Sequence, residues 1–417
     1  MKKIFLSNYK IITFLILILL CFYKSPYIFL NGRFIAEEGS FYFKNTFLHG
    51  FYYGLVQVYW ESSYFNFWAN LSSIISNFVP ISYSPLVSVY FAFLVKIYLF
   101  IYIIFTDSYF LNNKYKKIIC CFVVLASPPM AAEIWLNNLV SLVYFTIICI
   151  LVFFQKFDKK NLLTLLSPFI LLITSLSSII ACIFTPFYFF KLLKNKNSNN
   201  FYNFLSMFIG SCLQSYIFIY SKINNLQGID NQLRFDISYD KLINFTYNVI
   251  IKSFFGREFT QKIYYSFFEN INLLFLSIII LFLSILILMF ILKEFKRDKV
   301  IIYLIIFFIL QSILAIYGAK VDQVQGRYAV IPGALLIFIF LSLIDHPKIF
   351  VKSFATILII FSLSTGLYEY KKNNAHPQLL LCIDCPNWKN EVSKWKNDKN
   401  HELRIWDYTV NKRFSLN

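Results

Sequence analysis

Residues 84–105 read SPLVSVYFAFLVKIYLFIYIIF and carry a single charged side chain, Lys96. A stretch of about 20 apolar residues is long enough to cross the hydrocarbon core of a bilayer as one helix. We therefore expect a membrane-spanning helix over 84–105. One such helix already indicates a protein that is embedded in a membrane.

The composition of the whole chain agrees with that expectation. Hydrophobic residues make up 58% of the 417 residues and charged residues 14%, against about 45–50% and about 25% in soluble domains. Aromatic residues reach 20%, so a single Phe or Tyr is weak support for a function. The sequence predicts an all-α polytopic membrane protein.

Apolar runs recur along the chain and predict about eleven transmembrane helices. We expect these spans near 11–30, 84–105, 118–134, 137–154, 162–176, 178–191, 201–220, 271–292, 300–318, 329–345 and 353–369. Three longer regions, 31–83, 221–270 and 370–417, are expected to project from the membrane. Within the first, YFNFWANLSSIISNFVPI (64–81) mixes apolar and polar residues at helical spacing, which predicts an amphipathic helix in the membrane interface.

The basic residues predict the orientation, because Lys and Arg in short loops favour the cytoplasmic side. They cluster before the first span and in alternate connections: Lys2, Lys3, Lys10; Lys114, Lys116, Lys117; Lys156, Lys159, Lys160; Lys191, Lys194, Lys196; Lys293, Lys296, Arg297, Lys299; Lys348, Lys352. We expect a bacterial inner (plasma) membrane protein with a cytoplasmic N-terminus and an outward C-terminus. The net charge of +18 then reflects orientation and attraction to anionic lipid, and no nucleic-acid partner is expected.

Two adjacent carboxylates, Glu37 and Glu38, follow the first span in GRFIAEEGSFYF (32–43) and are expected to face outward. Ionisable groups close to a membrane are costly and are often functional. One carboxylate can accept a proton from a hydroxyl while the other raises its pKa or orients it, and a role as metal ligands is also open. The alternative is a pair of solvated acids that cap a short helix. Which glutamate would be the base stays open at this point.

Four short motifs resemble the GT-C superfamily of membrane glycosyltransferases. AEEG (36–39) is similar to the acidic doublet of the family's first outward loop, and YFNFWANLSSIISNFVPISYSPLV (64–87) resembles the interfacial helix that follows it. PPMAAEIWLNNLVSLVYF (128–145) resembles the second outward loop, with Glu133 and Asn137 at the helix ends. GRYAVIP (326–332), with Arg327 and Tyr328, is similar to a late Arg–Tyr–Pro element.

This resemblance implies a GT-C-like transmembrane domain over 1–369, followed by a small outward-facing C-terminal segment at 370–417. It implies transfer of a sugar from a polyprenyl-phosphate-linked donor, with Glu37 or Glu38 as the catalytic base. The acceptor would be a glycan, lipid or protein of the cell envelope, on the outer side of the inner membrane. The identities of the donor sugar and the acceptor stay open.

Outward-facing cations are the candidates for binding the donor phosphate, because guanidinium and ammonium groups pair with phosphate oxygens. Arg327, beside Tyr328, is the first candidate, and Arg33, Lys320 and Arg257 are weaker ones. A cation that snorkels to the interface would explain Arg327 as well.

Glu133 is a candidate second acid for acceptor recognition or metal binding, with a hydrated loop acid as the alternative. Asn137 is a candidate for substrate binding as well, and its alternative role is to cap the next helix.

The C-terminal segment contains its own set of features. Cys382 and Cys385 form CIDC, where an oxidising compartment favours a disulfide and free thiols are the alternative. NWKNEVSKWKND (387–398) predicts an amphipathic helix with Trp388 in packing, and HELRIWDY (401–408) a short strand. The four histidines lack ligand spacing, so no cofactor is assigned, and a divalent metal stays open.

Two other classes of protein compete with the glycosyltransferase. A flippase or transporter of lipid-linked glycans predicts ionisable residues in mid-span and internal repeats, and the expected spans carry few charges. A polysaccharide polymerase would use a large late loop, for which 221–270 is the candidate. The early acidic pair favours the glycosyltransferase over both.

Topology reporters test the predicted orientation. A reporter fused after Gly50 or after Asn374 should report from outside the cell, and one fused after Lys160 from the cytoplasm, because basic loops are retained inside. An outward signal at Lys160 would contradict this arrangement.

Overall fold

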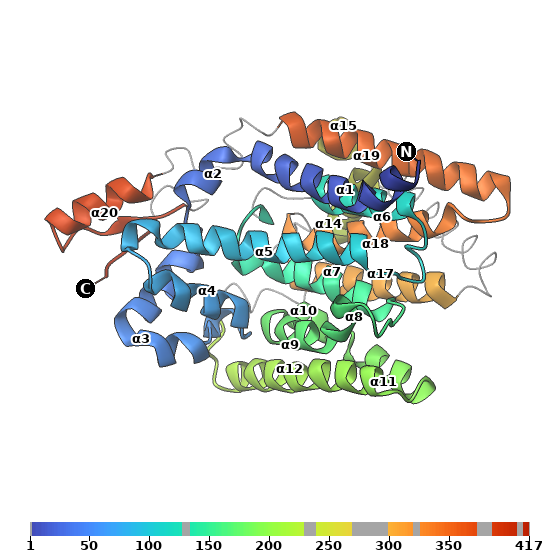
Figure 1. Cartoon of the computed structure of the whole chain (residues 1–417). Coiled ribbons are helices and arrows are strands. Elements are labelled where there is room, and N and C mark those ends of the chain that lie inside the picture. Colours follow the sequence, from blue (N-terminus) through green and yellow to red (C-terminus); the bar gives the residue numbers. More distant parts are fainter. Residues whose placement is uncertain are drawn as a thin grey trace. The chain divides into compact units, whose positions relative to one another are not determined.

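The computed structural model describes residues 2–126, 134–228, 239–268, 299–319, 326–372, 386–406 and 412–416. The fold is all-α, apart from a two-stranded antiparallel sheet near the C-terminus (Figure 1). The chain divides into two compact units, described separately here. The first comprises Met1–Thr106, Ala132–Gly228 and Asn373–Asn417, and the second comprises Asp107–Ala131 and Ile229–Lys372.

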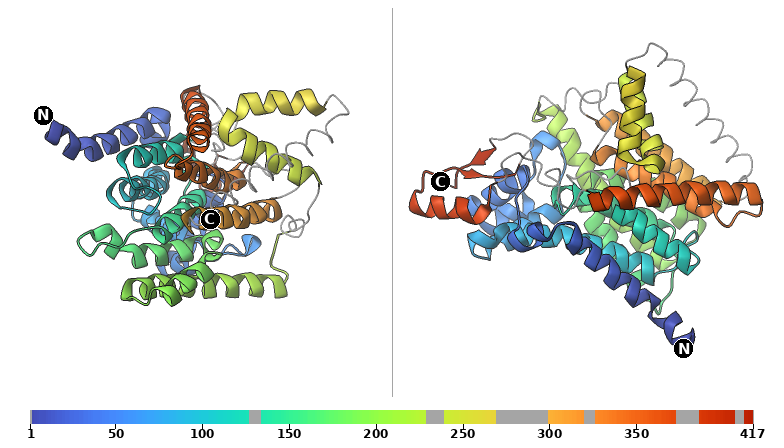
Figure 2. Two further views of the ribbon diagram at one scale, coloured as in Figure 1. Left: turned by 90° about the vertical axis from the view of Figure 1, so that its right-hand side faces the viewer. Right: turned by 90° about the horizontal axis from the view of Figure 1, so that it is seen from above.

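The first unit is built around α5, Ser84–Phe105, which packs against α1, α2, α4 and α7. Its α-helices are α1 Lys2–Lys24, α2 Pro26–Asn31, α3 Lys44–Val56, α4 Phe67–Asn77, α5, α7 Leu142–Phe153, α8 Leu162–Leu165, α9 Ser167–Ser177, α10 Ile179–Cys182, α11 Thr185–Lys194, α12 Ser198–Ile223 and α20 Trp388–Asn397. A π-helix, η1 Glu38–Phe43, and short 3-10 turns η2 Trp60–Ser62, η3 Ile81–Tyr83 and η5 Leu139–Ser141 connect them. Helix α12 packs along α9 and also contacts α11, and the green ribbons of these helices can be followed in Figure 2.

The second unit consists of α6 Lys114–Ala126, α14 Tyr239–Phe245, the π-helix η6 Thr246–Ile251, α15 Lys252–Phe268, α17 Lys299–Gly318, α18 Arg327–Leu343 and α19 Ile349–Lys372. Helix α17 packs along α18, and α15 packs along α19. Near the N-terminus of α6, the buried Lys116 forms an ion pair of 2.6 Å with Asp345, just beyond α18. This contact joins the basic end of α6 to the end of α18.

Four helices are long and apolar enough to cross a membrane, within the ranges that the structure describes. They cover Ile81–Phe105, Ser198–Ile223, Lys299–Gly318 and Ile349–Lys371. A bent pair, Ser167–Ser177 with Ile179–Lys194, adds a fifth if it is counted as one span. These helices confirm the expected spans 84–105, 201–220, 300–318 and 353–369. The prediction of about eleven transmembrane helices is wrong.

The wrong spans are apolar enough but too short or broken. Range 137–154 contains α7, with 12 residues, and range 118–134 contains the end of α6, with 13 residues, while residues 127–133 lie outside the described ranges. A helix of that length reaches about 20 Å, less than the hydrocarbon thickness of about 30 Å. The pair at 162–191 bends by 117°, and 11–30 is divided at Ser25 before Pro26. Range 329–345 overlaps α18, which ends at Leu343 and has 17 residues, and 271–292 lies outside the described residues.

The helix expected within 64–81 is present as α4, but its polar residues face inward. Asn66 caps its N-terminus, because its side chain accepts a hydrogen bond from the Ala69 N–H. Asn70 and Ser73 are buried and donate to backbone carbonyls, at 2.9 Å to Gln57 and 2.6 Å to Tyr42. Ile75 is exposed, and Phe67, Trp68 and Leu71 are partly exposed.

The C-terminal segment contains the predicted amphipathic helix, α20, and the predicted short strand, β1 Leu403–Arg404, which pairs with β2 Arg413–Phe414. Trp388 is buried, as expected for packing, and its indole N–H donates to the Ile81 carbonyl at 2.7 Å. Phe34 and Phe43 pack against the same cluster. The segment is therefore joined to the first unit by a shared apolar core.

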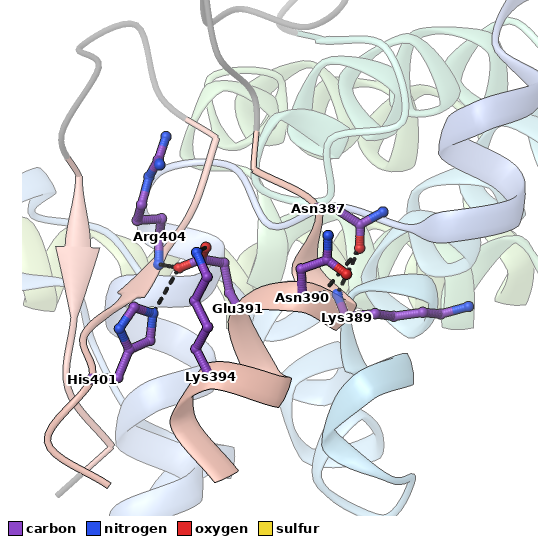
Figure 3. A network of polar contacts seen from close by, with 7 residues as sticks. All are labelled: Asn387, Lys389, Asn390, Glu391, Lys394, His401 and Arg404. Atoms are coloured by element: carbon purple, nitrogen blue, oxygen red, sulfur yellow. Dashed lines mark hydrogen bonds and ion pairs between the residues drawn. The ribbon is translucent and has the colours of Figure 1, made fainter. Parts of the chain in front are cut away.

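A polar network holds α20 to β1 (Figure 3). The buried carboxylate of Glu391 accepts hydrogen bonds from Lys394 at 2.9 Å, from the Arg404 N–H at 3.2 Å, and pairs with His401 at 3.0 Å. Burial acts to raise the pKa of Glu391, but Lys394, His401 and the Arg404 N–H together bring the pKa below its usual value. The network therefore favours the ionised carboxylate.

Gly32 allows a close approach that a side chain would prevent. It ends α2 at φ 69°, and a Cβ there would lie 2.6 Å from Leu86 N. We predict that Gly32→Ala costs about 2–4 kcal/mol of unfolding free energy, because it adds a backbone clash to a left-handed conformation. Gly50→Ala is the control, since Gly50 has φ 82° with nothing within 4 Å of a Cβ, and should cost only about 1–2 kcal/mol. Equal losses in thermal unfolding would contradict the close-approach argument.

Candidate functional site

The two glutamates lie at the start of η1, at the end of a short extended stretch that leaves α2. Ile35 in that stretch forms a parallel bridge with Trp406, and the Ala36 N–H donates to the Trp406 carbonyl at 2.9 Å. Ala36 has φ 46°, a conformation that is uncommon for alanine. The backbone turns sharply there, and Glu37 and Glu38 consequently face different surroundings.

Glu38 is built into the interior of the first unit and is only 5% exposed. Its Oε2 accepts from the Ile35 N–H at 3.0 Å. Its Oε1 accepts from the Ser88 hydroxyl at 2.9 Å and from the Asn138 N–H at 2.6 Å. One carboxylate thereby joins the first loop, helix α5 and the turn before η5.

Burial is the largest influence on Glu38 and raises the pKa of its carboxyl group above the usual value. The hydrogen bonds from Ile35, Asn138 and Ser88 and the positive charge of Arg33 act in the opposite direction, but they do not cancel the effect of burial. Glu38 therefore holds a proton more tightly than an exposed glutamate does.

Arg33 is 1% exposed and lies among aromatic side chains. Its Nη2 donates to the Trp135 carbonyl, and its guanidinium group lies 5.2 Å from the Trp406 ring centroid. Trp135 also carries the Nζ of Lys96 over its ring at 3.7 Å, and its indole N–H donates to Ser25 at 2.6 Å. These contacts make Arg33 a structural part of the interior rather than an exposed cation that awaits a phosphate.

Glu37 is the accessible member of the pair. Its side chain is 30% exposed, and its Oε1 lies 2.9 Å from the Nζ of Lys412, which is similarly exposed. An ion pair at such a surface is weak, because water competes for both charges. The Glu37 carboxylate can therefore exchange its partner for another donor.

Tyrosines surround the Glu37 side of the site and were not singled out by the sequence. Tyr42, from η1, is close enough to Glu37, Tyr59 and Tyr64 for their charges to influence its pKa, which burial raises well above the usual value. Tyr59 and Tyr64 form an antiparallel bridge, and the Tyr59 hydroxyl donates to Glu61 at 2.6 Å. With 29 Tyr in the chain, no sequence signal distinguishes these three.

Asn137 is buried, and its side chain has the local capping role that we gave as the alternative to function. Its Oδ1 accepts from the Leu139 N–H at 3.0 Å. Glu133 lies outside the described residues, as do Lys320, Cys382 and Cys385, so the expected second acid, the weaker cation and the disulfide remain predictions.

The other predicted cations belong to the second unit. Arg327 is the first residue of α18 and is half-buried, and its guanidinium group lies 5.4 Å from the Tyr328 ring centroid. Arg257 is exposed and follows Gly256, where α15 is kinked at φ 77°. The Arg257 N–H donates to Glu369 of α19. Arg257 is therefore positioned by its backbone, and Arg327 stands at a helix N-terminus, where the helix dipole also favours an anion.

Two other features bear on the location of the site. No group of three or more His, Cys, Asp or Glu side chains gathers to hold a metal within the described ranges. An open apolar hollow lined by Phe14, Ile101, Phe105 and Leu162 lies at the C-terminal end of α5. Ser88, which binds Glu38, is near the other end of α5, about 20 Å away at 1.5 Å per residue. The hollow is thus separate from the glutamates.

No protein-family model, curated protein or solved structure matches this chain.

The two glutamates should differ in stability measurements. Glu38→Gln should lower the unfolding free energy by about 1–3 kcal/mol. The substitution replaces one carboxylate oxygen by an NH₂ group, which cannot accept the hydrogen bond that a backbone N–H donates to that oxygen in the unaltered protein. Glu37→Gln, at the surface, should change it by about 0.5 kcal/mol or less. Thermal unfolding of the purified variants in one detergent measures both, and equal losses would contradict the assignment.

The pH dependence of stability tests the same burial. The folded-state pKa of Glu38 is raised, so the folded protein binds its proton more tightly than the unfolded chain does. The Glu38 contribution should therefore fall as pH rises through the interval from the usual carboxyl pKa to the raised one. Glu38→Gln should remove that component, and an unchanged profile would contradict it.

Proposed function

We propose that the chain is a membrane glycosyltransferase of the GT-C type. It transfers a sugar from a polyprenyl-phosphate-linked donor to a hydroxyl of a cell-envelope acceptor, on the outer side of the inner membrane. The observation that carries this proposal is the division between two adjacent glutamates: Glu38 is buried and held by three donors, and Glu37 is accessible. A short acidic pair with one fixed and one available carboxylate suits general base catalysis.

In this proposal Glu37 is the base and Glu38 is a positioning residue. The Glu37 carboxylate accepts the proton of the acceptor hydroxyl as its oxygen attacks the anomeric carbon of the donor. The bond from that carbon to the phosphate oxygen breaks, and the lipid phosphate leaves with the electron pair. Glu38 fixes the backbone next to Glu37, because its oxygens bind the loop, α5 and the turn before η5.

Negative charge develops on the leaving phosphate and needs a cation. The sequence predicts Arg327 for this role, and this assignment stays a prediction; Arg327 is half-buried at the N-terminus of α18, in the second unit. Arg33 is a poorer choice, because its guanidinium group is enclosed by Trp406 and the Trp135 carbonyl. Arg257 and Lys320 remain secondary candidates.

Removal of the base is the direct test of this function. Glu37→Gln should reduce the rate of sugar transfer by about 10²–10⁴-fold, because the amide cannot accept a proton. The measurement is incorporation of radiolabelled sugar from polyprenyl-phosphate donors in membranes of a deletion strain carrying each variant at equal protein level. Glu402→Gln, an exposed carboxylate of the same unit, is the matched control and should leave transfer unchanged.

The same assay separates the competing classes of protein. A single added sugar supports the transferase, a ladder of products indicates a polymerase, and movement of lipid-linked glycan without a new glycosidic bond indicates a transporter. Full transfer by Glu37→Gln would exclude Glu37 as the base.

A further inference from the structure

We propose that Tyr42, Tyr59 and Tyr64, with Glu37 and Glu61, form a binding site for a neutral, hydroxyl-rich sugar. The five residues are called the tyrosine site below. Its assignment to the acceptor, rather than to the donor, rests on the proposed function. The existence of the sugar site does not, because binding can be measured without turnover.

The hydroxyl of Tyr42 is the first observation. Tyr42 is 2% exposed, and its hydroxyl oxygen has no hydrogen-bond partner within the part of the chain that the structure describes. Buried polar groups are normally paired, and one that is not often marks a place for a ligand or water. The Phe41 ring lies 5.1 Å from the Tyr42 ring and 4.8 Å from the Tyr59 ring, and Tyr59 forms a bridge with Tyr64. Tyr42 is the most deeply buried member of the tyrosine site.

The second observation is the kind of groups that line the site. Tyr59 and Tyr64 are half-buried, and the Tyr59 ring lies 4.8 Å from the Phe41 ring. The exposed Glu61 accepts from the Tyr59 hydroxyl at 2.6 Å. Phenols donate and accept hydrogen bonds, and carboxylates accept them, while aromatic faces pack against the C–H faces of a sugar ring. This combination fits adjacent hydroxyls on a pyranose.

The charges of the site exclude an anion as the favoured ligand. Glu37 and Glu61 each place a carboxylate at the site, and the Glu37 carboxylate pairs with Lys412 at 2.9 Å. A carboxylate accepts hydrogen bonds and has no donor to offer a phosphate, and like charges repel, which disfavours a phosphate beside Glu37 and Glu61. A neutral sugar is not repelled by these carboxylates, and its hydroxyls can donate hydrogen bonds to the Glu37 carboxylate in place of Lys412.

The backbone around the tyrosine site is fixed before any ligand arrives. The Tyr42 carbonyl accepts from Ser73 at 2.6 Å and from Gln57 at 3.2 Å. Tyr59 and Tyr64 are held by their bridge, which closes through Ser63 at φ 58°. A site whose walls are already ordered loses little conformational entropy on binding.

Saturation-transfer NMR on the full-length protein in nanodiscs tests the proposal. The probes are the methyl glycosides of glucose, galactose and mannose, together with glucose 1-phosphate as an anionic sugar. We expect saturation of at least one methyl glycoside and weaker saturation of glucose 1-phosphate. Tyr42→Phe and Tyr59→Phe should each weaken glycoside binding by about tenfold, the effect of losing one hydrogen bond.

Tyr52→Phe is the matched control. Tyr52 lies on α3 and is 84% exposed, outside the tyrosine site, so its variant should bind the glycoside as the unaltered protein does. If Tyr42→Phe fails to fold, Tyr59→Phe carries the test, because its half-buried hydroxyl is bonded only at the surface, to Glu61.

Three outcomes overturn the tyrosine site: no glycoside is saturated, binding is unchanged in Tyr59→Phe, or glucose 1-phosphate binds more tightly than the glycosides. Its failure is separate from failure of the proposed function. Loss of transfer in Glu37→Gln with no glycoside binding would leave the transferase without this acceptor site. Tyrosine-dependent binding with full transfer by Glu37→Gln would leave a sugar-binding site without the assigned base.

Discussion

The buried carboxylate of Glu38 is the interaction on which the candidate site depends. A carboxylate removed from water is costly unless its oxygens are satisfied, and here they receive hydrogen bonds from Ile35, Ser88 and the Asn138 backbone. These donors come from three segments that are distant in the chain. The bonds fix the start of η1 to α5, and the backbone of Glu37, the preceding residue, is fixed with it. Pairing of Ile35 with Trp406 holds the same stretch from the other side.

Helices α3 and α4 have the reverse of the polarity expected for a helix in water. Asn70, Ser73 and Ser76 of α4 are buried and bonded within the protein. Most of the exposed residues are apolar or aromatic, among them Tyr52, Val56 and Ile75. Such a surface loses free energy in water and gains it in lipid or its interface. The polar side chains of α4 are thereby kept inside the protein, where Ser73 donates to the Tyr42 carbonyl.

Cations in the interior of the first unit are held by aromatic rings as well as by oxygen atoms. The Nζ of Lys96 lies over Trp135, and the guanidinium group of Arg33 lies beside Trp406. An aromatic ring has no net charge, but its face attracts a cation through the quadrupole of the ring. Lys96 lies within α5, a candidate span, where this kind of contact lets a charge be buried without a carboxylate.

The sequence by itself determined the class of protein, the four spans that are long and unbroken, the helix α20 and the position of the acidic pair, because each depends on local composition or periodicity. It overestimated the number of spans, since hydropathy counts apolar residues and cannot detect that α7 has only 12 residues or that the chain bends near Ser178. Only the tertiary structure decided which glutamate is buried. That difference arises from Ser88 and Asn138, which lie 50 and 100 residues from Glu38. The same holds for the tyrosines around Glu37, because contacts between distant residues leave no pattern in a single chain.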